Sequence, residues 1–296
     1  MWQKQLKIAL VGSIYQGQMA DVVQRLFDAA SIYNAKFVIP DTFYNFLRDS
    51  LCVNIPQCEI FSGNDFEADV IVCIGGDGTF LSAASRVGNK QIPILGINTG
   101  RLGFLASFSP DDVEDAVACI CNASYSVEER SVLSLSCDDF ELGGYPYALN
   151  EIAILKHDIA SMISIHTCID GEYLTTYQAD GLIIGTPTGS TAYSLSVGGP
   201  IIVPQSDTVS LTPVAPHSLN MRPIVLCDTA EIELCVESRS HNFLISVDGR
   251  SKSYPENIHL RIRKADYAVK VITRPKESFF STLREKMMWG ADNRQK

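Results

Sequence analysis

The chain has 296 residues, 46% of them hydrophobic, which is enough for two ordinary domains with buried cores. No apolar run approaches the about 20 residues of a membrane span, and the N-terminus shows no secretory signal. A formal net charge of -10 argues against a nucleic-acid partner. Small phosphorylated ligands are still compatible with it, because backbone amides and divalent metal can hold them. Nine scattered cysteines match no zinc spacing, so we expect a reduced, cytoplasmic protein with no membrane partner.

Strand and helix patterns alternate through the first 125 residues. Residues 6–12 form an apolar strand pattern, and apolar side chains recur at helical spacing from residue 19 to residue 30. The loop between them has P-loop-like glycine spacing, but Gln18 stands where that motif needs lysine. The further elements are strands at 36–39, 70–74 and 92–97 and helices at 79–87 and 109–120. This order predicts an α/β domain with a parallel, Rossmann-like sheet over residues 1–126.

Period-two alternation replaces helical spacing in the second half of the chain. It is clearest at residues 131–137 and 161–167. Other strand-like runs cover residues 172–178, 181–185, 230–236, 243–247, 258–262 and 267–272. We therefore expect an all-β sandwich domain over residues 127–275. Residues 279–289 have the pattern of a short helix, and we expect the tail, residues 276–296, to dock on the first domain.

Asp77 lies inside a glycine-rich turn that follows a buried strand. Three glycines, Gly75, Gly76 and Gly78, let backbone N–H groups approach an anion with no Cβ in the way. A tight strand-to-helix turn alone would explain these glycines, but it would not explain an acid among them. A carboxylate beside phosphates suits a proton acceptor or a metal ligand. The motif therefore favours a phosphoryl-transfer site.

Two polar places in the second half allow both a structural and a functional interpretation. Asn150 and Glu151 interrupt an apolar strand. They form either a bulge or buried polar pair, or a bidentate site for ribose hydroxyls. Residues 186–194 follow another apolar strand and carry five hydroxyl groups around one helix start. They form either a loop of helix caps or a cradle for ribose or phosphate. Tyr193 is either a stacking partner for a base or an ordinary core residue.

With these pieces the chain resembles the NAD kinase family along nearly its whole length. The motifs are GGDGTF at residues 75–80, GINTGRLGFL at 96–105, Asn150-Glu151, and DGLIIGTPTGSTAYSLSVGGP at 180–200. GGDG alone is shared with lipid kinases and phosphofructokinases, whereas the 180–200 segment is far more specific. The resemblance implies transfer of the terminal phosphate of ATP, or of polyphosphate, to the 2′-hydroxyl of the adenosine ribose of NAD. It also implies Mg²⁺ or Mn²⁺ held mainly by the nucleotide, and a homo-oligomer.

The resemblance also implies roles for particular residues. Asp77 is the expected general base, and the turn Gly75, Gly76, Gly78 and Thr79 is the expected phosphate loop. The residues expected to bind NAD are Asp77, Gly78, Asn150, Glu151, Asp180, Thr191, Ala192, Tyr193, Ser194, Leu195, Ser196 and Ala215. Asp180 is expected near the nicotinamide end or across a subunit contact. No histidine shows ligand spacing, and we assign no residue to metal.

The chain departs from the family pattern at two positions that often carry positive charge. Gln178 stands where many members have arginine, and Ser82 stands where many have a basic residue. Arg101 and Arg250 are possible substitutes, although each is also consistent with a surface or turn residue. Two rival functions remain: a GGDG-type kinase acting on a lipid or sugar, and a dinucleotide sensor without activity.

Overall fold

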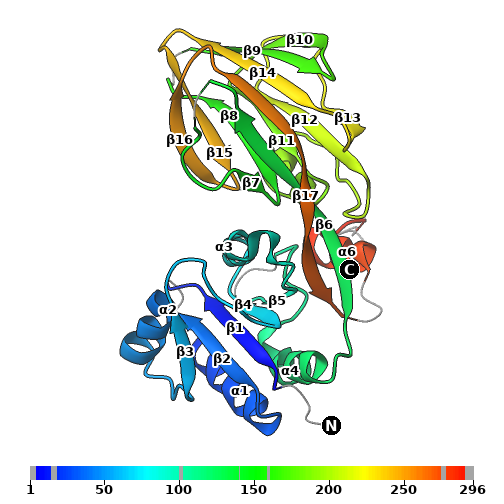
Figure 1. The fold of residues 1–296 in the computed structure, drawn as a ribbon. Helices are drawn as coiled ribbons and strands as arrows, with labels where there is room; N and C mark the ends of the chain where they lie inside the picture. The colour runs from blue at the N-terminus through cyan, green and yellow to red at the C-terminus, as the bar shows by residue number, and fades with distance from the viewer. Residues whose placement is uncertain are drawn as a thin grey trace. The chain divides into compact units, whose positions relative to one another are not determined.

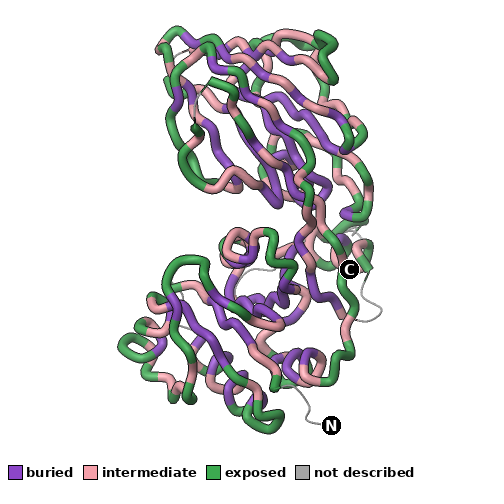
Figure 2. Tube along the Cα trace, viewed as in Figure 1, coloured by how far each residue is buried: buried purple, intermediate pink, exposed green. Residues whose placement is uncertain are grey.

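The computed structural model describes residues 5–14, 19–99, 103–139, 141–158, 161–274 and 278–290. The chain divides into two compact units, the first made of residues 1–129 and 269–296, and the second of residues 130–268. Figure 1 shows the elements of each unit, and Figure 2 shows that buried residues concentrate along their strands. Within the described residues, no helix is both long and apolar enough to span a bilayer.

The first unit contains a parallel sheet. Its strands, in spatial order, are β3 (Cys58–Phe61), β2 (Lys36–Pro40), β1 (Lys7–Gly12), β4 (Val70–Ile74), β5 (Ile94–Ile97) and the end of β17 (His259–Thr273). The strand order reverses between β1 and β4. Ligands of open α/β sheets bind beyond the carboxyl ends of strands at such a reversal. The glycine-rich turn after β4 lies at this point, and the predicted parallel α/β domain is confirmed.

Helices cover both faces of this sheet. Helices α1 (Ala20–Ile32) and α4 (Val113–Cys121) bury apolar stripes in one core cluster with β1, β2 and β4. Helix α3 (Asp77–Val87) packs on the other face, where Phe80 fits against Gly96. Ser109 caps the turn η4 (Pro110–Asp112) before α4, as its Ser-Pro-Asp-Asp sequence predicts.

The sequence patterns did not predict a short connection in the first unit. Helix α2 (Asp41–Asn45), the π-turn η2 (Phe46–Ser50) and strand β3 follow β2. They are too short to show a clear period. The C-terminal helix α6 (Phe279–Met287) belongs to this unit, and the Lys286 ammonium lies 5.5 Å from the centroid of the Phe104 ring.

The second unit is a sandwich of two largely antiparallel sheets. One sheet has the order β10 (Glu172–Ala179), β9 (Ile163–Ile169), β14 (Ile232–Ser238) and β17, with β6 (Ser126–Cys137) and β7 (Tyr147–Ala148) beyond. The other has the order β13 (Ile224–Cys227), β12 (Thr208–Val214), β11 (Gly181–Gly185), β8 (Glu151–Lys156), β15 (Asn242–Val247) and β16 (Arg250–Pro255). Alternate residues from both sheets share one apolar core. This confirms the predicted all-β sandwich.

Several strands of the second unit differ from the prediction. Strands β12, β13 and β16 were not predicted. Strand β13 has only four residues, β12 contains a proline, and β16 consists mainly of serines and cations. The two expected strands, 258–262 and 267–272, are joined in the single strand β17, which begins at His259. The exposed Arg263 and Lys264 in its middle hid this continuity.

Candidate active site

In the first unit, the turn after β4 brings Asp77 to the start of a helix. Gly75 has a φ of +152°, and a Cβ there would lie 2.3 Å from Oγ1 of Thr79, so this position requires glycine. Gly76 is the N-cap of α3 and Asp77 is its first residue. Helix geometry leaves the first N–H groups of α3 without intrahelical acceptors, and the helix dipole favours negative charge there. The turn can therefore receive an anion.

Two backbone amides of the 103–105 loop hold the Asp77 carboxylate. Phe104 donates its N–H to Oδ2 over 2.9 Å, and Leu105 donates its N–H to Oδ1 over 3.1 Å. A Cβ on Gly103 would come within 2.0 Å of Oδ1, so only glycine lets the loop approach this closely. Each carboxylate oxygen keeps a further lone pair for a ligand. The GINTGRLGFL motif thus orients Asp77.

In the second unit, Asp248 holds the Asn150–Glu151 segment. Its Oδ2 accepts the N–H of Leu149 at 2.9 Å, and its Oδ1 accepts those of Asn150 at 2.8 Å and Glu151 at 3.2 Å. Asp248 lies in the β15–β16 turn with a φ of +47°, and its own N–H donates to the carbonyl of Glu151. Sequence reasoning missed this residue. The Asp-Gly pair at 248–249, directly after the predicted strand 243–247, was the available signal.

Asn150 and Glu151 form a buried pair that has unused hydrogen-bonding capacity. Only 8% of Asn150 and 7% of Glu151 are exposed. Oδ1 of Asn150 and Oε2 of Glu151 have no hydrogen-bond partner, although Tyr193 offers Glu151 its backbone N–H. Burial, followed by the charge of Asp248, raises the pKa of Glu151 to about 7. Burial likewise raises the pKa of Asp248. Buried polar atoms without partners are costly, which indicates a polar ligand.

The hydroxyl-rich segment after β11 packs on the face of the sheet that carries Glu151. A Cβ on Gly189 would lie 2.1 Å from the carbonyl oxygen of Asn150, so this glycine permits close contact. Four of the five hydroxyls already bond within the protein. Thr186 donates to the carbonyl of Leu149 at 2.6 Å, and the Ser194 hydroxyl bonds that of Thr212 at 2.9 Å. Ser190 donates to the carbonyl of Pro187 at 2.7 Å, and Thr191 to that of Thr188 at 3.4 Å. Only the buried hydroxyl of Thr188 is without a partner among the five. Most of the hydroxyls that were expected to form a ligand cradle therefore hold the loop in place instead.

The short helix α5 (Tyr193–Ser196) presents part of the segment to solvent. Tyr193 is 37% exposed, so it is not an ordinary core residue. Ala192 and Leu195 are half-buried, and Ser196 is exposed with its hydroxyl bonded to the carbonyl of Tyr193. These side chains border the surface beside Glu151.

Asp180 and Ala215 lie at the opposite end of the same strands. Gly185 pairs with Glu151 whereas Gly181 pairs with Leu155, which puts Asp180 roughly 16 Å along β11 from the Glu151 end. Its carboxylate forms an ion pair of 2.8 Å with Lys156. Ala215, which has a φ of +44°, directly follows the β12 residue that pairs with Gly181. Within one chain, these two residues do not join the Asn150–Glu151 pair.

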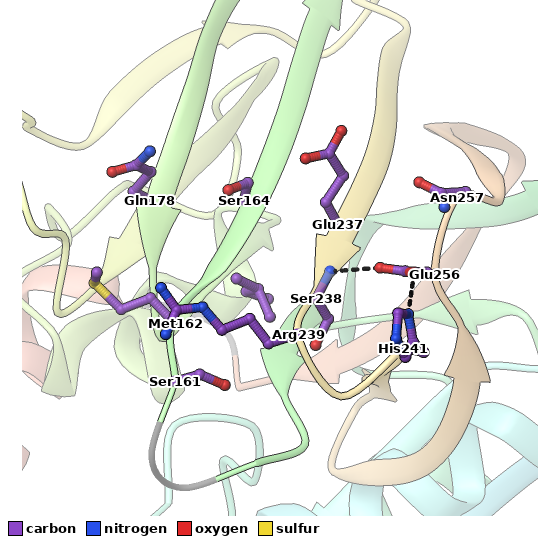
Figure 3. A pocket seen from close by; sticks show the side chains of 11 residues that line it. Ser161, Met162, Ser164, Gln178, Glu237, Ser238, Arg239, His241, Glu256 and Asn257 are labelled. Atoms are coloured by element: carbon purple, nitrogen blue, oxygen red, sulfur yellow. Dashed lines mark hydrogen bonds and ion pairs between the residues drawn. The ribbon is translucent and has the colours of Figure 1, made fainter.

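The positions with missing positive charge have different surroundings. Gln178 lines a cavity of about 610 Å³ together with Ser164, Glu237 and Arg239, as Figure 3 shows. Ser82 is exposed on α3. Arg250 is the exposed first residue of β16, and its Nε donates to the carbonyl of Val247 at 3.2 Å.

The loop at residues 15–17, Gln18 and Arg101 lie outside the described residues.

No protein-built metal site lies within the described part of the chain, where no three His, Cys, Asp or Glu residues gather closely enough to hold an ion. Asp77 stands beside the anion-receiving turn as a single carboxylate. A carboxylate beside an anion-receiving turn fits a divalent metal carried by nucleotide phosphates.

Both halves of the chain match family models. Residues 56–125 match the ATP-NAD kinase N-terminal domain, and residues 149–274 match the ATP-NAD kinase C-terminal domain. An NAD kinase of Bacteroides fragilis is 58% identical over 289 residues, covering 98% of this chain and 100% of the relative. An NAD kinase of Flavobacterium psychrophilum is 41% identical over 293 residues, with 98% and 100% covered.

Solved structures share the fold. Yeast NADH kinase complexed with NADH superposes with a TM-score of 0.88 at 23% identity, covering 100% of this chain and 92% of the other. An NAD kinase from Archaeoglobus fulgidus in complex with ATP gives a TM-score of 0.73 at 27% identity, with 96% and 99% covered.

Proposed function

Because this chain belongs to the NAD kinase family, it is a phosphotransferase that converts NAD to NADP, and we propose which residues do the work. The observation that carries the assignment is the pair of unpartnered buried oxygens, Oδ1 of Asn150 and Oε2 of Glu151. Such oxygens can accept hydrogen bonds from the vicinal hydroxyls of a ribose. ATP is the donor, as its complex with the Archaeoglobus enzyme supports.

Asp77 is the general base of this proposal. Its carboxylate takes the proton of the 2′-hydroxyl of the adenosine ribose as that oxygen attacks the terminal phosphorus of ATP. The bond between this phosphorus and the β,γ-bridging oxygen breaks, and ADP leaves. The two amides from Phe104 and Leu105 support the role because they fix the carboxylate while leaving lone pairs for the proton. A positioned base of this kind contributes on the order of 10²–10⁴-fold.

The glycine turn holds phosphate in this scheme. The backbone N–H groups at the start of α3 and the small residues Gly75, Gly76, Gly78 and Thr79 would approach the donor phosphates closely. Divalent metal would reach the site on the nucleotide and neutralise charge on its phosphates. Asp77 is the carboxylate best placed to orient such a complex.

The second unit would bind the dinucleotide. Asn150 and Glu151 would accept hydrogen bonds from ribose hydroxyls, and Asp248 would keep both in position through the backbone. Tyr193 would lie against the adenine, supported by its exposure beside Glu151. The residues Thr191, Ala192, Ser194, Leu195 and Ser196 would form the wall behind it.

A homo-oligomer would give Asp180 and Ala215 a place in the reaction. Both lie at the end of β11 and β12 away from Glu151, so one chain alone cannot use them with Glu151 on the same ribose. A neighbouring copy, or the nicotinamide half of the same substrate, is the proposed contact. The location is proposed to be cytoplasmic, which the nine free cysteines support.

The test is an assay of NADP formation with purified protein and Mg²⁺. NAD is supplied with ATP, other nucleoside triphosphates or polyphosphate, and NADP is measured with an NADP-specific dehydrogenase. We expect NADP with ATP. Consumption of ATP with a lipid or sugar acceptor, and none with NAD, would overturn the proposal.

A further inference from the structure

A small pocket opens at one edge of the sandwich, where the loop 142–146 covers the hairpin of β15 and β16. Its volume is about 200 Å³, several times that of one water molecule. The side chains that line it, which we call the edge pocket, include Tyr145, Arg250, Ser251, Lys252 and Tyr254.

Two exposed cations lie on the same face of the edge strand β16 as the buried Tyr254. Arg250, Lys252 and Tyr254 alternate with serines along β16, and Tyr254 is buried in the core. Lys252 pairs with the core residue Ile245, and Arg250 pairs with Val247. The two charged side chains therefore share the face of the strand that the core uses elsewhere.

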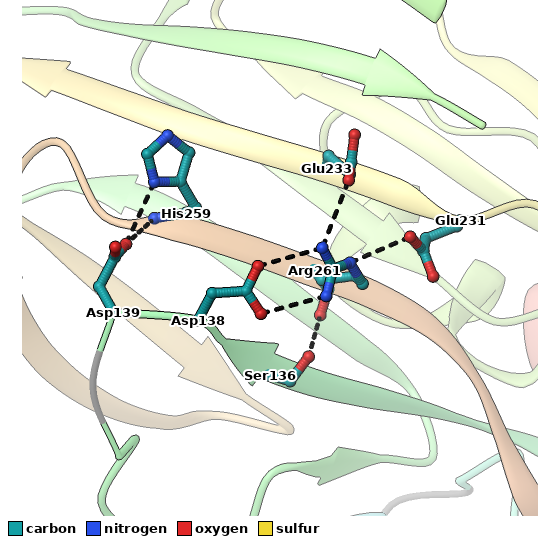
Figure 4. Close-up of polar contacts among 7 residues, drawn as sticks. All are labelled: Ser136, Asp138, Asp139, Glu231, Glu233, His259 and Arg261. Carbon is teal, nitrogen blue, oxygen red and sulfur yellow. Dashed lines mark hydrogen bonds and ion pairs between the residues drawn. The ribbon is translucent and has the colours of Figure 1, made fainter. Parts of the chain in front are cut away.

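Neither cation forms an ion pair with a carboxylate of the described residues, although the charge of Arg250 acts at longer range on the Asp248 carboxylate. Within the described residues, no carboxylate oxygen lies within 4.0 Å of the side-chain nitrogens of Arg250 or Lys252, and no acid lines the edge pocket. Arg261 on the other sheet shows the contrast, because Asp138, Glu231 and Glu233 surround it in Figure 4. In a chain of net charge -10, two adjacent cations without an ion pair are candidates for an anionic ligand.

The surroundings hold these cations in place. The Arg250 guanidinium lies 5.4 Å from the centroid of the Tyr145 ring, and its Nε donates to the carbonyl of Val247. A Cβ on Gly143 would lie 3.1 Å from the Lys252 ammonium, so glycine lets the loop backbone come near. The Tyr254 hydroxyl ties this loop down by donating to the Gly143 carbonyl at 3.2 Å.

We propose that the edge pocket binds a phosphate group, with Arg250 and Lys252 as its cations. Arginine offers paired N–H donors to phosphate, and lysine adds a point charge. The edge pocket lies on the core side of its sheet, whereas Glu151 lies on the opposite face, so it is separate from the proposed dinucleotide site. Its ligand is inorganic phosphate, polyphosphate or the phosphates of a nucleotide.

The test measures binding without turnover. Calorimetry at low ionic strength is run on the Asp77→Asn protein with phosphate, tripolyphosphate and ATP in separate arms. Arg250→Gln and Lys252→Gln should each weaken tripolyphosphate binding about tenfold. Lys264→Gln, which changes a cation already paired with Asp228, should leave binding unchanged.

The arms identify the source of the phosphate. The same losses with ATP would assign the site to nucleotide phosphates, and losses with tripolyphosphate alone would assign it to inorganic chains. Parental affinity in both variants for all three ligands would overturn the proposal and leave the cations as protection of an edge strand. Because binding is measured in a protein with the base removed, failure here is distinct from failure of the NAD kinase assignment.

Discussion

The carboxylate of Asp77 accepts a hydrogen bond of 3.1 Å from the backbone N–H of Leu105, 28 residues further along the chain. Phe104 supplies the second amide, so the loop between β5 and α4 fixes the rotation of the proposed base. The base is thus oriented by backbone rather than by a second titratable side chain. Changes in the loop should therefore alter catalysis without touching Asp77 itself.

Gly103→Ala should lower kcat by roughly 10²-fold, because misplacing a catalytic group by about 1 Å has an effect of that order. The new Cβ would meet Oδ1 of Asp77 at 2.0 Å and force the loop or the carboxylate to move. Steady-state kinetics and calorimetric NAD titration measure the effect. An unchanged kcat would show that the orientation of Asp77 by this loop has no part in the reaction.

Gly78→Ala separates the phosphate-loop role from folding. No atom lies within 4 Å of a Cβ at this position, and Gly78 is inside α3. Alanine should therefore raise the free energy of unfolding by about 0.5–1 kcal/mol. If donor phosphates approach this backbone, the same substitution should raise KM for ATP about tenfold. A parental KM in a stabilised variant would remove Gly78 from the phosphate loop.

Asp248→Asn should raise KM for NAD about tenfold with a smaller change in kcat. An amide has one oxygen and cannot accept all three N–H groups of residues 149–151. Loss of the charge should also lower the pKa of Glu151, which Asp248 raises. The limb of the kcat/KM profile near pH 7 should therefore move to lower pH.

Asp170→Asn is the matched control for that experiment. Asp170 also lies in an Asp-Gly hairpin turn with a φ of +52°, and its carboxylate accepts the N–H of Glu231 at 2.8 Å. It should affect stability only. If both variants changed stability alone, Asp248 would be a turn residue without influence on NAD binding.

Glu151→Gln should lower NAD affinity and raise the free energy of unfolding, with the gain in stability depending on pH. The folded state holds the Glu151 proton up to about pH 7, against an ordinary pKa of 4.5, so its contribution to stability is full below pH 4.5 and is lost as pH rises through 7. Glutamine has no proton to lose. The variant should therefore be more stable than the parent by roughly 3 kcal/mol at pH 8, with little difference at pH 4.

Differential scanning calorimetry across this pH range measures that difference, and the NADP assay measures the accompanying loss of NAD affinity. A constant difference in Tm from pH 4 to pH 8 would mean that folding does not raise the pKa of Glu151.

Long apolar periods made most of the fold predictable. Strand β4 and helices α1 and α4 each show one clear period, and the change from helical to alternating spacing near residue 126 predicted the all-β half. Short elements such as α2 and β3 have too few residues for a period, and β16 carries exposed cations on the face that holds the buried Tyr254.

The sequence-based view of the site named its polar residues but not their supports. Asp248 lies 97 residues beyond Glu151 and accepts hydrogen bonds from backbone amides. Because every residue except proline has such an amide, the residue types at 149–151 do not reveal this contact. The hydroxyls of residues 186–194 suggested ligand contacts, yet most of them fix their own loop. Thr186, for example, donates to the carbonyl of Leu149. Whether a polar side chain supports the loop or is free to bind a ligand depends on which distant strands lie beside it in the fold.

The most direct test of the central claim is single-turnover NADP formation by Asp77→Asn, with NAD affinity measured by calorimetry on the same preparation. Asparagine keeps the size and one hydrogen-bond acceptor but cannot take the proton from the 2′-hydroxyl. We expect the rate to fall by on the order of 10²–10⁴-fold while NAD affinity stays within a few-fold of the parent. NADP formation at the parental rate would contradict the account.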